Sequence, residues 1–83
     1  MDHFESKRVL VIDDDPVVRG LMVASLEEAG HSVESVTDDE VAWCDLLSNN
    51  YDLLVTDDVR GKVSRLASFR KIRVISCLDY LQS

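Results

Sequence analysis

The sequence predicts one α/β domain built around a parallel sheet, and three observations support this. Short apolar segments alternate with segments of helical periodicity along the 83 residues. Two apolar segments are continuous rather than alternating, as in strands that helices cover on both faces. Both of these segments end in aspartates, and right-handed connections bring such ends to one edge of a parallel sheet. A chain of this length forms one domain with a small core.

The first strand and helix have the clearest signals. Residues 8–12, Arg-Val-Leu-Val-Ile, predict a buried strand. Asp15 is a favourable N-cap, and Pro16 suits the first helical position because its missing N–H has no partner there. Apolar residues then recur at helical spacing until Gly30, a residue that commonly ends a helix.

A second strand and helix follow. Residues 31–36 alternate in polarity, which predicts a strand more exposed than the first. Thr37 and Glu40 have the spacing of a capping box, so a helix is expected from there to about Leu47. Two inward faces are compatible with this helix, namely Val41 with Cys44 and Leu47, or Ala42 with Leu46.

The two cysteines predict no metal or disulfide chemistry. Cys44 and Cys77 have no metal-ligand spacing and no neighbouring cysteine. We therefore expect two buried thiols in a cytoplasmic protein. The acidic start of the chain lacks the features of a signal peptide, and no apolar run is long enough to cross a membrane.

The remaining chain begins with a third predicted strand over residues 51–56, which is followed by Asp57 and Asp58. Beyond it, two arrangements are open. In the first, a short helix over 63–70 leads to a β-branched fourth strand over 71–76, and the chain ends in a helical turn from Leu78 to Gln82. In the second, one continuous helix runs from Val63 to Leu81.

Charge is distributed unevenly along the chain. Residues 1–59 hold fifteen acidic and three basic side chains, which gives −12, whereas residues 60–83 hold six basic and one acidic, which gives +5. An acidic body makes nucleic acid an improbable main partner, because contacts to phosphate dominate such binding. The basic segment is instead expected to dock on acidic surface of its own or another chain.

The aspartates that follow the buried strands are the candidate functional residues. Asp13 and Asp14 follow the first strand and Asp57 follows the third, so a parallel sheet brings all three together. At 4 Å and an effective dielectric constant near 20, each pair of like charges costs about 4 kcal/mol, which favours a bound cation. An oxygen-only set of ligands suits Mg²⁺ or Mn²⁺. Such a metal could also neutralise a phosphoryl group on one carboxylate.

Three stretches resemble the first half of a bacterial response-regulator receiver domain, the phosphoryl-accepting module of two-component signalling. They are residues 9–19 (VLVIDDDPVVR), 27–33 (EEAGHSV) and 51–57 (YDLLVTD). The resemblance covers residues 7–58 and implies a truncated flavodoxin-like parallel sheet with strand order 2-1-3-4. This fold is a β-α-β-α-β core with a short helix and a possible fourth strand. Residues 1–83 are then a single domain whose basic C-terminal segment, 60–83, diverges from the family.

The resemblance also implies roles for individual residues. Asp14 would bind the metal directly, and Asp13 would act mainly through water. Asp57 would be both a metal ligand and the phosphoacceptor, while the backbone carbonyl of Val59 would complete the protein's ligands. Ser76 is a weaker match to the hydroxyl residue that contacts the phosphoryl group in this family.

Residues 60–83 depart from the family pattern. The acceptor loop, Asp58 to Gly61, is short and lacks a proline, and Lys62 and Lys71 do not match the usual phosphoryl-contacting lysine. A fifth strand and the last helices of the family are not matched. An open sheet edge and an uncovered apolar face favour self-association, so we expect a homodimer or a larger assembly.

Two functions follow. In the first, the chain is a phosphorelay receiver that accepts a phosphoryl group on Asp57, with Mg²⁺, from a sensor histidine kinase or a phosphotransfer protein. In the alternative, it is a degenerate receiver-like module for protein interaction or dimerisation that works without phosphorylation. No nucleophile–base pair or general acid of an independent enzyme is visible, so we expect no enzymatic activity of its own.

Overall fold

A computed structural model describes residues 5–82, and the elements appear in strictly alternating order. They are β1 (Arg8–Ile12), α1 (Pro16–Glu28), β2 (Ser32–Val36), α2 (Asp39–Ser48), β3 (Leu53–Thr56), α3 (Lys62–Phe69), β4 (Arg73–Ser76) and α4 (Cys77–Gln82). The acidic start of the chain noted above lies mostly outside the described residues. Within 5–82, no helix is long and apolar enough to cross a membrane.

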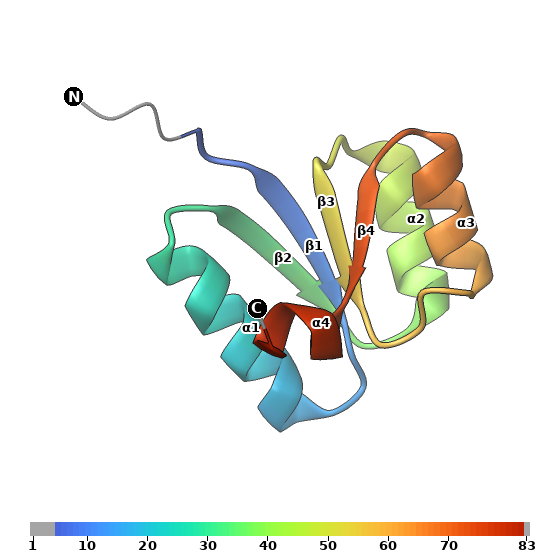
Figure 1. The fold of residues 1–83 in the computed structure, drawn as a ribbon. Coiled ribbons are helices and arrows are strands. Elements are labelled where there is room, and N and C mark those ends of the chain that lie inside the picture. The colour runs from blue at the N-terminus through green and yellow to red at the C-terminus, as the bar shows by residue number, and fades with distance from the viewer. Residues whose placement is uncertain (1–4, 83) are drawn as a thin grey trace.

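All four strands are parallel, in the order β2-β1-β3-β4. This order confirms the predicted fold class, a small flavodoxin-like sheet, and settles the open question beyond Gly61 in favour of a fourth strand. The basic segment therefore continues the same sheet as the first half of the chain. Figure 1 shows the carboxyl ends of the strands meeting at one edge, where the connections to the helices begin.

Helices cover both faces of the sheet, so the core has two halves (Figure 1). One half joins alternate residues of β1 and β3 to α2 and α3, and includes Leu10, Leu54, Leu46 and Ala67. The other joins the intervening strand residues to α1 and to the start of α4, and includes Val9, Val11, Val55, Met22 and Cys77. Strands buried on both faces explain why the apolar segments of the sequence are continuous.

Helix α4 lies over the same face of the sheet as α1, where the sequence predicted an uncovered apolar surface. Cys77 packs into the core there, and the hydroxyl groups of Tyr80 and Ser25 are hydrogen-bonded at 3.0 Å. The cover is partial, since Leu78 and Leu81 remain exposed. Part of the face expected to be open is therefore filled by the last helix.

The start and the inner face of α2 correct two details of the sequence prediction. The N-cap is Asp38 rather than Thr37, and its carboxylate accepts a hydrogen bond from the Val41 N–H at 3.0 Å. Ala42 and Leu46 are fully buried, which selects the second of the two faces left open. In consequence Cys44 is exposed, so the expectation of two buried thiols is wrong for Cys44 and right for Cys77.

The turn between α3 and β4 has a conformation that its sequence does not predict. Lys71 has a φ of 64°, in the left-handed region that usually holds glycine. The N–H of Lys71 bonds to the Ser68 carbonyl and that of Ile72 to the Ala67 carbonyl, a Schellman motif. The same motif ends α1, where Gly30 occupies the left-handed position with a φ of 98°.

Candidate metal and phosphoryl site

Three carboxylates meet at the carboxyl edge of the sheet. Ile12 at the end of β1 pairs with Thr56 at the end of β3, so the residues that follow both strands lie at the same level. Asp13, Asp14 and Asp57 each place a carboxylate oxygen within 4.8 Å of those of the other two. The structure thus brings together the three side chains that the sequence predicted to converge.

Asp13 is held by its neighbours. Its side chain is buried, at 5% exposure, and one carboxylate oxygen accepts a hydrogen bond from the main-chain N–H of Asp15 at 2.9 Å. The guanidinium of Arg19 donates to the main-chain carbonyl of Asp13 at 2.7 Å. Asp15 in turn caps α1 by accepting from the N–H of Val17. These bonds fix the β1–α1 connection that carries the acidic pair.

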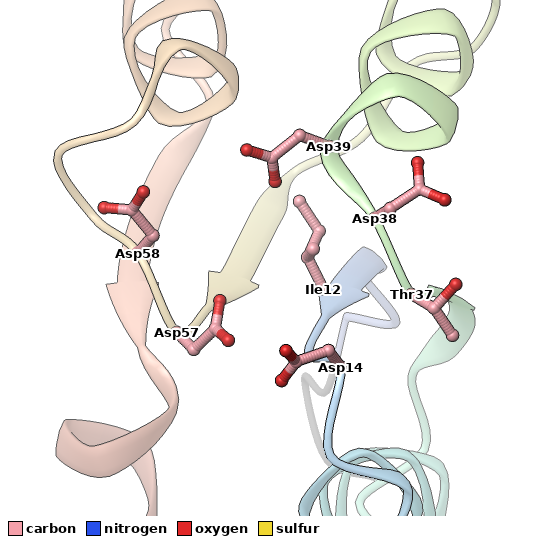
Figure 2. Close-up of a pocket in the computed structure, with 7 residues that line it drawn as sticks. All are labelled: Ile12, Asp14, Thr37, Asp38, Asp39, Asp57 and Asp58. Atoms are coloured by element: carbon pink, nitrogen blue, oxygen red, sulfur yellow. The ribbon is translucent and has the colours of Figure 1, made fainter.

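Asp14 and Asp57 face an open cavity of about 450 Å³. Figure 2 shows their carboxylates projecting toward one another from the ends of two strands. Asp38 and Asp39, at the start of α2, and Asp58, directly after Asp57, also line this cavity (Figure 2). The cavity is therefore lined mainly by carboxylates, with Ile12 and Thr37 as its other lining residues.

Burial and the close approach of the three carboxylates raise the pKa of Asp57. Partial burial raises the pKa of its carboxyl group, and the negative charges of Asp13 and Asp14 raise it further, with a smaller effect from Asp39. A main-chain hydrogen bond opposes the shift. A raised pKa means that the charged form is destabilised in the absence of a counter-ion, which is the condition that favours a cation.

The loop after β3 distinguishes Asp57 from Asp58. The Asp58 carboxylate accepts a hydrogen bond from the Arg60 N–H at 3.1 Å, and its main-chain groups bond to the hydroxyls of Thr56 and Ser64. Asp58 therefore stabilises the loop, whereas Asp57 belongs to the converging group. Val59 lies in this loop with an exposed side chain and is not among the described residues that line the cavity.

Ser76 lies one strand away from Asp57, because it pairs with Thr56 across β3 and β4. Ser76 and Asp57 line a second cavity, of about 260 Å³. Its other walls are mainly apolar: Val18, Cys77, Leu78 and Leu81. The Ser76 hydroxyl accepts a hydrogen bond from the Asp79 N–H at 2.9 Å and so caps the start of α4. The structure thus places the predicted hydroxyl residue beside Asp57.

Cys77 is a neighbour of the site that sequence reasoning did not identify. Burial raises the pKa of its thiol to about 12, and a hydrogen bond to the Asp13 carboxylate and the negative charge there add to the shift. The thiol is therefore neutral at physiological pH. The sequence did contain one signal for this: Cys77 directly follows the fourth strand, and so comes at the same edge of the sheet as the aspartates.

The lysines that failed to match the family pattern also lie outside the cavity in the described structure. The Lys62 ammonium lies 5.7 Å from the centre of the Trp43 ring, a cation–π contact between α3 and α2. Lys71 occupies the turn that precedes β4. Neither residue is among the described residues that line the two cavities around Asp57.

The ligand atoms suit a small, hard cation. Mg²⁺ binds oxygens at about 2.0–2.1 Å in an octahedron, so oxygens on opposite sides of one ion are about 4.2 Å apart. The three carboxylates, within 4.8 Å of one another, come close to that spacing. The cavity leaves room for water to complete the coordination, as Mg²⁺ sites usually require.

Comparison with known proteins gives partial relatives. No family model matches the chain. A gliding motility regulatory protein of Myxococcus xanthus is 36% identical over 66 residues, 80% of this chain but 8% of that protein. The transcriptional regulatory protein TcrA of Mycobacterium tuberculosis is 36% identical over 50 residues, 60% of this chain and 20% of that protein. The chain thus spans a small part of each relative, and both are regulatory proteins by name.

Proposed function

We propose that this chain is a receiver module of a two-component phosphorelay, which accepts a phosphoryl group on Asp57 with Mg²⁺ or Mn²⁺ bound beside it. The supporting observation is the convergence of Asp13, Asp14 and Asp57 from two strand ends at an open cavity. Similarity to two proteins named as regulators agrees with a regulatory role. The proposed donor is a sensor histidine kinase or a phosphotransfer protein in the cytoplasm.

In this proposal the residues of the site would have different roles in metal binding and phosphoryl transfer. Asp13, Asp14 and Asp57 hold the metal, with Asp14 and Asp57 as the direct side-chain ligands and the Val59 carbonyl as a further ligand. When bound, the metal supplies positive charge that offsets the charge of the incoming phosphoryl group. An Asp57 oxygen forms the new bond to phosphorus, and the bond from phosphorus to the donor nitrogen breaks, with its electron pair remaining on the nitrogen. The Ser76 hydroxyl lies on the other side of Asp57, where it can donate to a phosphoryl oxygen.

A second candidate function is a receiver-like interaction module that needs no phosphorylation. It is favoured by one observation: Lys62 and Lys71 lie outside the cavities around Asp57 among the described residues. A phosphoryl group on Asp57 would then have no lysine beside it. Metal binding is common to both functions, so it does not distinguish them.

Incubation with acetyl phosphate and Mg²⁺ separates the two. The receiver function predicts a mass gain of one phosphoryl group that is stable in acid, labile in base and absent in Asp57→Asn. Asp58→Asn is the matched control, because this substitution removes the adjacent carboxylate and should leave the gain intact. A folded wild-type chain that binds Mn²⁺ but gains no mass would reject the receiver function and support the interaction module.

A further inference from the structure

Two surfaces of opposite charge lie side by side on this molecule. Helices α2 and α3 both start at the carboxyl edge of the sheet and pack against each other (Figure 1). The start of α2 carries exposed acidic residues, Asp38, Asp39 and Glu40, which with Asp58 we name the acidic rim. The start and outer side of α3 carry exposed Arg60, Lys62 and Arg65, which we name the basic face.

These neighbouring surfaces do not neutralise each other within the molecule. Among the described residues 5–82, Lys7–Glu5 is the one ion pair within 4.0 Å. Arg60 is exposed two residues after Asp58, yet it is the Arg60 main-chain N–H, not its guanidinium, that meets the Asp58 carboxylate. Arg65 donates to the main-chain carbonyl of Arg60, a contact that leaves its charge unpaired.

The geometry points to a second copy of this chain as the partner: we propose that the protein forms a two-fold dimer in which the basic face of each copy lies on the acidic rim of the other. A two-fold axis that passes between two adjacent patches brings each patch onto the opposite patch of the other copy, so the acidic–basic contact occurs twice in the dimer. A partner whose surface carries charge of one sign only is disfavoured, because one of the two patches would then meet a surface that repels it. A nucleic acid would contact the basic face only beside a row of carboxylates, which is unfavourable.

Exposed apolar side chains add to this surface. Val41, in the first turn of α2, and Val59, in the loop before α3, are each about half exposed. Both residues lie in the same segments as the charged patches. Protein interfaces commonly combine apolar contacts with a charged periphery, so these valines are suited to the centre of the contact. The proposed contact does not require phosphorylation, although Asp38, Asp39 and Asp58 of the acidic rim also line the cavity beside Asp57.

The first test is sedimentation of the full 83-residue chain over a range of concentrations. Exposed ion pairs are individually weak, so we expect a reversible dimer with a dissociation constant on the order of 100 μM at low salt. The Debye length falls from about 10 Å at 0.1 M salt to about 3 Å at 1 M. The dimer should therefore weaken at least about tenfold between those conditions. A monomer at all salt concentrations would overturn the proposal.

The second test exchanges the charges. Arg60→Glu with Arg65→Glu, and separately Asp39→Lys with Glu40→Lys, should each give a monomer, because both contacts of each homodimer become repulsive. An equimolar mixture should restore the dimer, since the reversed face of one variant meets the reversed rim of the other. A mixture that stays monomeric, with both variants folded by circular dichroism, would overturn the two-fold arrangement.

Controls keep the second test decisive. Glu27→Lys with Glu28→Lys reverses two exposed charges at the far end of α1 and should leave the dimer unchanged. If Asp39→Lys with Glu40→Lys fails to fold, Asp39→Asn with Glu40→Gln removes the charges more gently and should weaken the dimer. A short DNA duplex that binds the basic face, with no self-association, would assign that face to nucleic acid and overturn the proposal.

Discussion

A carboxylate oxygen of Asp13 accepts a hydrogen bond from the Asp15 main-chain N–H at 2.9 Å, whereas the neighbouring Asp14 projects freely into the open cavity. Two adjacent acids thus have different surroundings: Asp13 is buried and bonded within its own loop, and Asp14 is exposed. The difference indicates that Asp13 mainly shapes the loop and that Asp14 has its oxygens available to a ligand. It also leads to distinct predictions for the two.

Asp14→Asn should weaken Mn²⁺ binding by at least about tenfold with little change in stability, because it removes one charged ligand at an exposed position. Asp13→Ala should weaken binding too, and should also lower the free energy of unfolding by about 1–2 kcal/mol, because it removes the acceptor of the bond from the Asp15 N–H. Calorimetric titration with Mn²⁺ and thermal unfolding of the metal-free proteins measure both effects. Equal loss of stability in the two variants would contradict the assigned difference.

Asp57→Asn should make the metal-free protein more stable at pH 7. The pKa of Asp57 is raised in the folded state, so the folded protein binds more protons than the unfolded chain as pH rises above the usual range for aspartate. Stability is therefore lost as pH rises through the raised pKa, and the asparagine variant avoids this loss. The melting temperatures of the two proteins should converge as pH falls below the usual aspartate range.

Mg²⁺ provides a further check on Asp57. It should raise the melting temperature of the wild type more than that of Asp57→Asn, because the wild type binds the cation more tightly. Glu34→Gln, on β2 and outside the acidic cavity, controls for the loss of one negative charge. An asparagine variant that is less stable than the wild type at pH 7 without metal would show that Asp57 is not under electrostatic strain.

The inner face of α2 can be tested by two adjacent leucines. Leu46 is fully buried in the core, whereas Leu47 is 56% exposed. Leu46→Ala should lower the free energy of unfolding by about 2–5 kcal/mol, and Leu47→Ala should change it by less than about 0.5 kcal/mol. Urea unfolding measures both, and the reverse order would mean that the other face of α2 packs inward.

The two left-handed residues make a matched pair. Lys71→Gly should stabilise the protein by about 0.5–1 kcal/mol, because glycine adopts a positive φ without the steric cost that lysine bears. Gly30→Ala should destabilise it by about 1 kcal/mol for the same reason. Chemical denaturation detects changes of this size. Destabilisation by Lys71→Gly would show that the lysine side chain contributes more than its backbone conformation costs.

The two thiols should react very differently. Cys44 is exposed, whereas Cys77 is buried with a pKa of about 12. A thiol reagent at pH 8 should therefore modify one cysteine in the folded protein and the second only after unfolding, since the thiolate is the reactive form. Mass spectrometry of the digested protein identifies the modified residue. Early modification of Cys77 would mean that α4 does not stay docked.

The sequence by itself determined the order of strands and helices as far as the third strand, the start of α1 and the three aspartates of the site. Each of these has a local signal: a continuous apolar segment, the N-cap Asp15 with Pro16, and acids that directly follow buried strands. Parallel connection rules then place those acids at one edge, so their convergence follows from order alone. The register of β1 with β3 agrees with that expectation.

Only the tertiary structure decided the remaining features. The inner face of α2 has no strong periodicity in sequence, and the choice of Ala42 and Leu46 depends on contacts with β1, β3 and α3. The break between α3 and β4 occurs at a lysine, because burial of Ile72 stabilises a turn that local preferences disfavour. The position of Cys77 beside Asp13, and the packing of α2 against α3, likewise join residues far apart in the chain. Local signals record the preferences of neighbouring residues, whereas these features depend on which distant surfaces pack together.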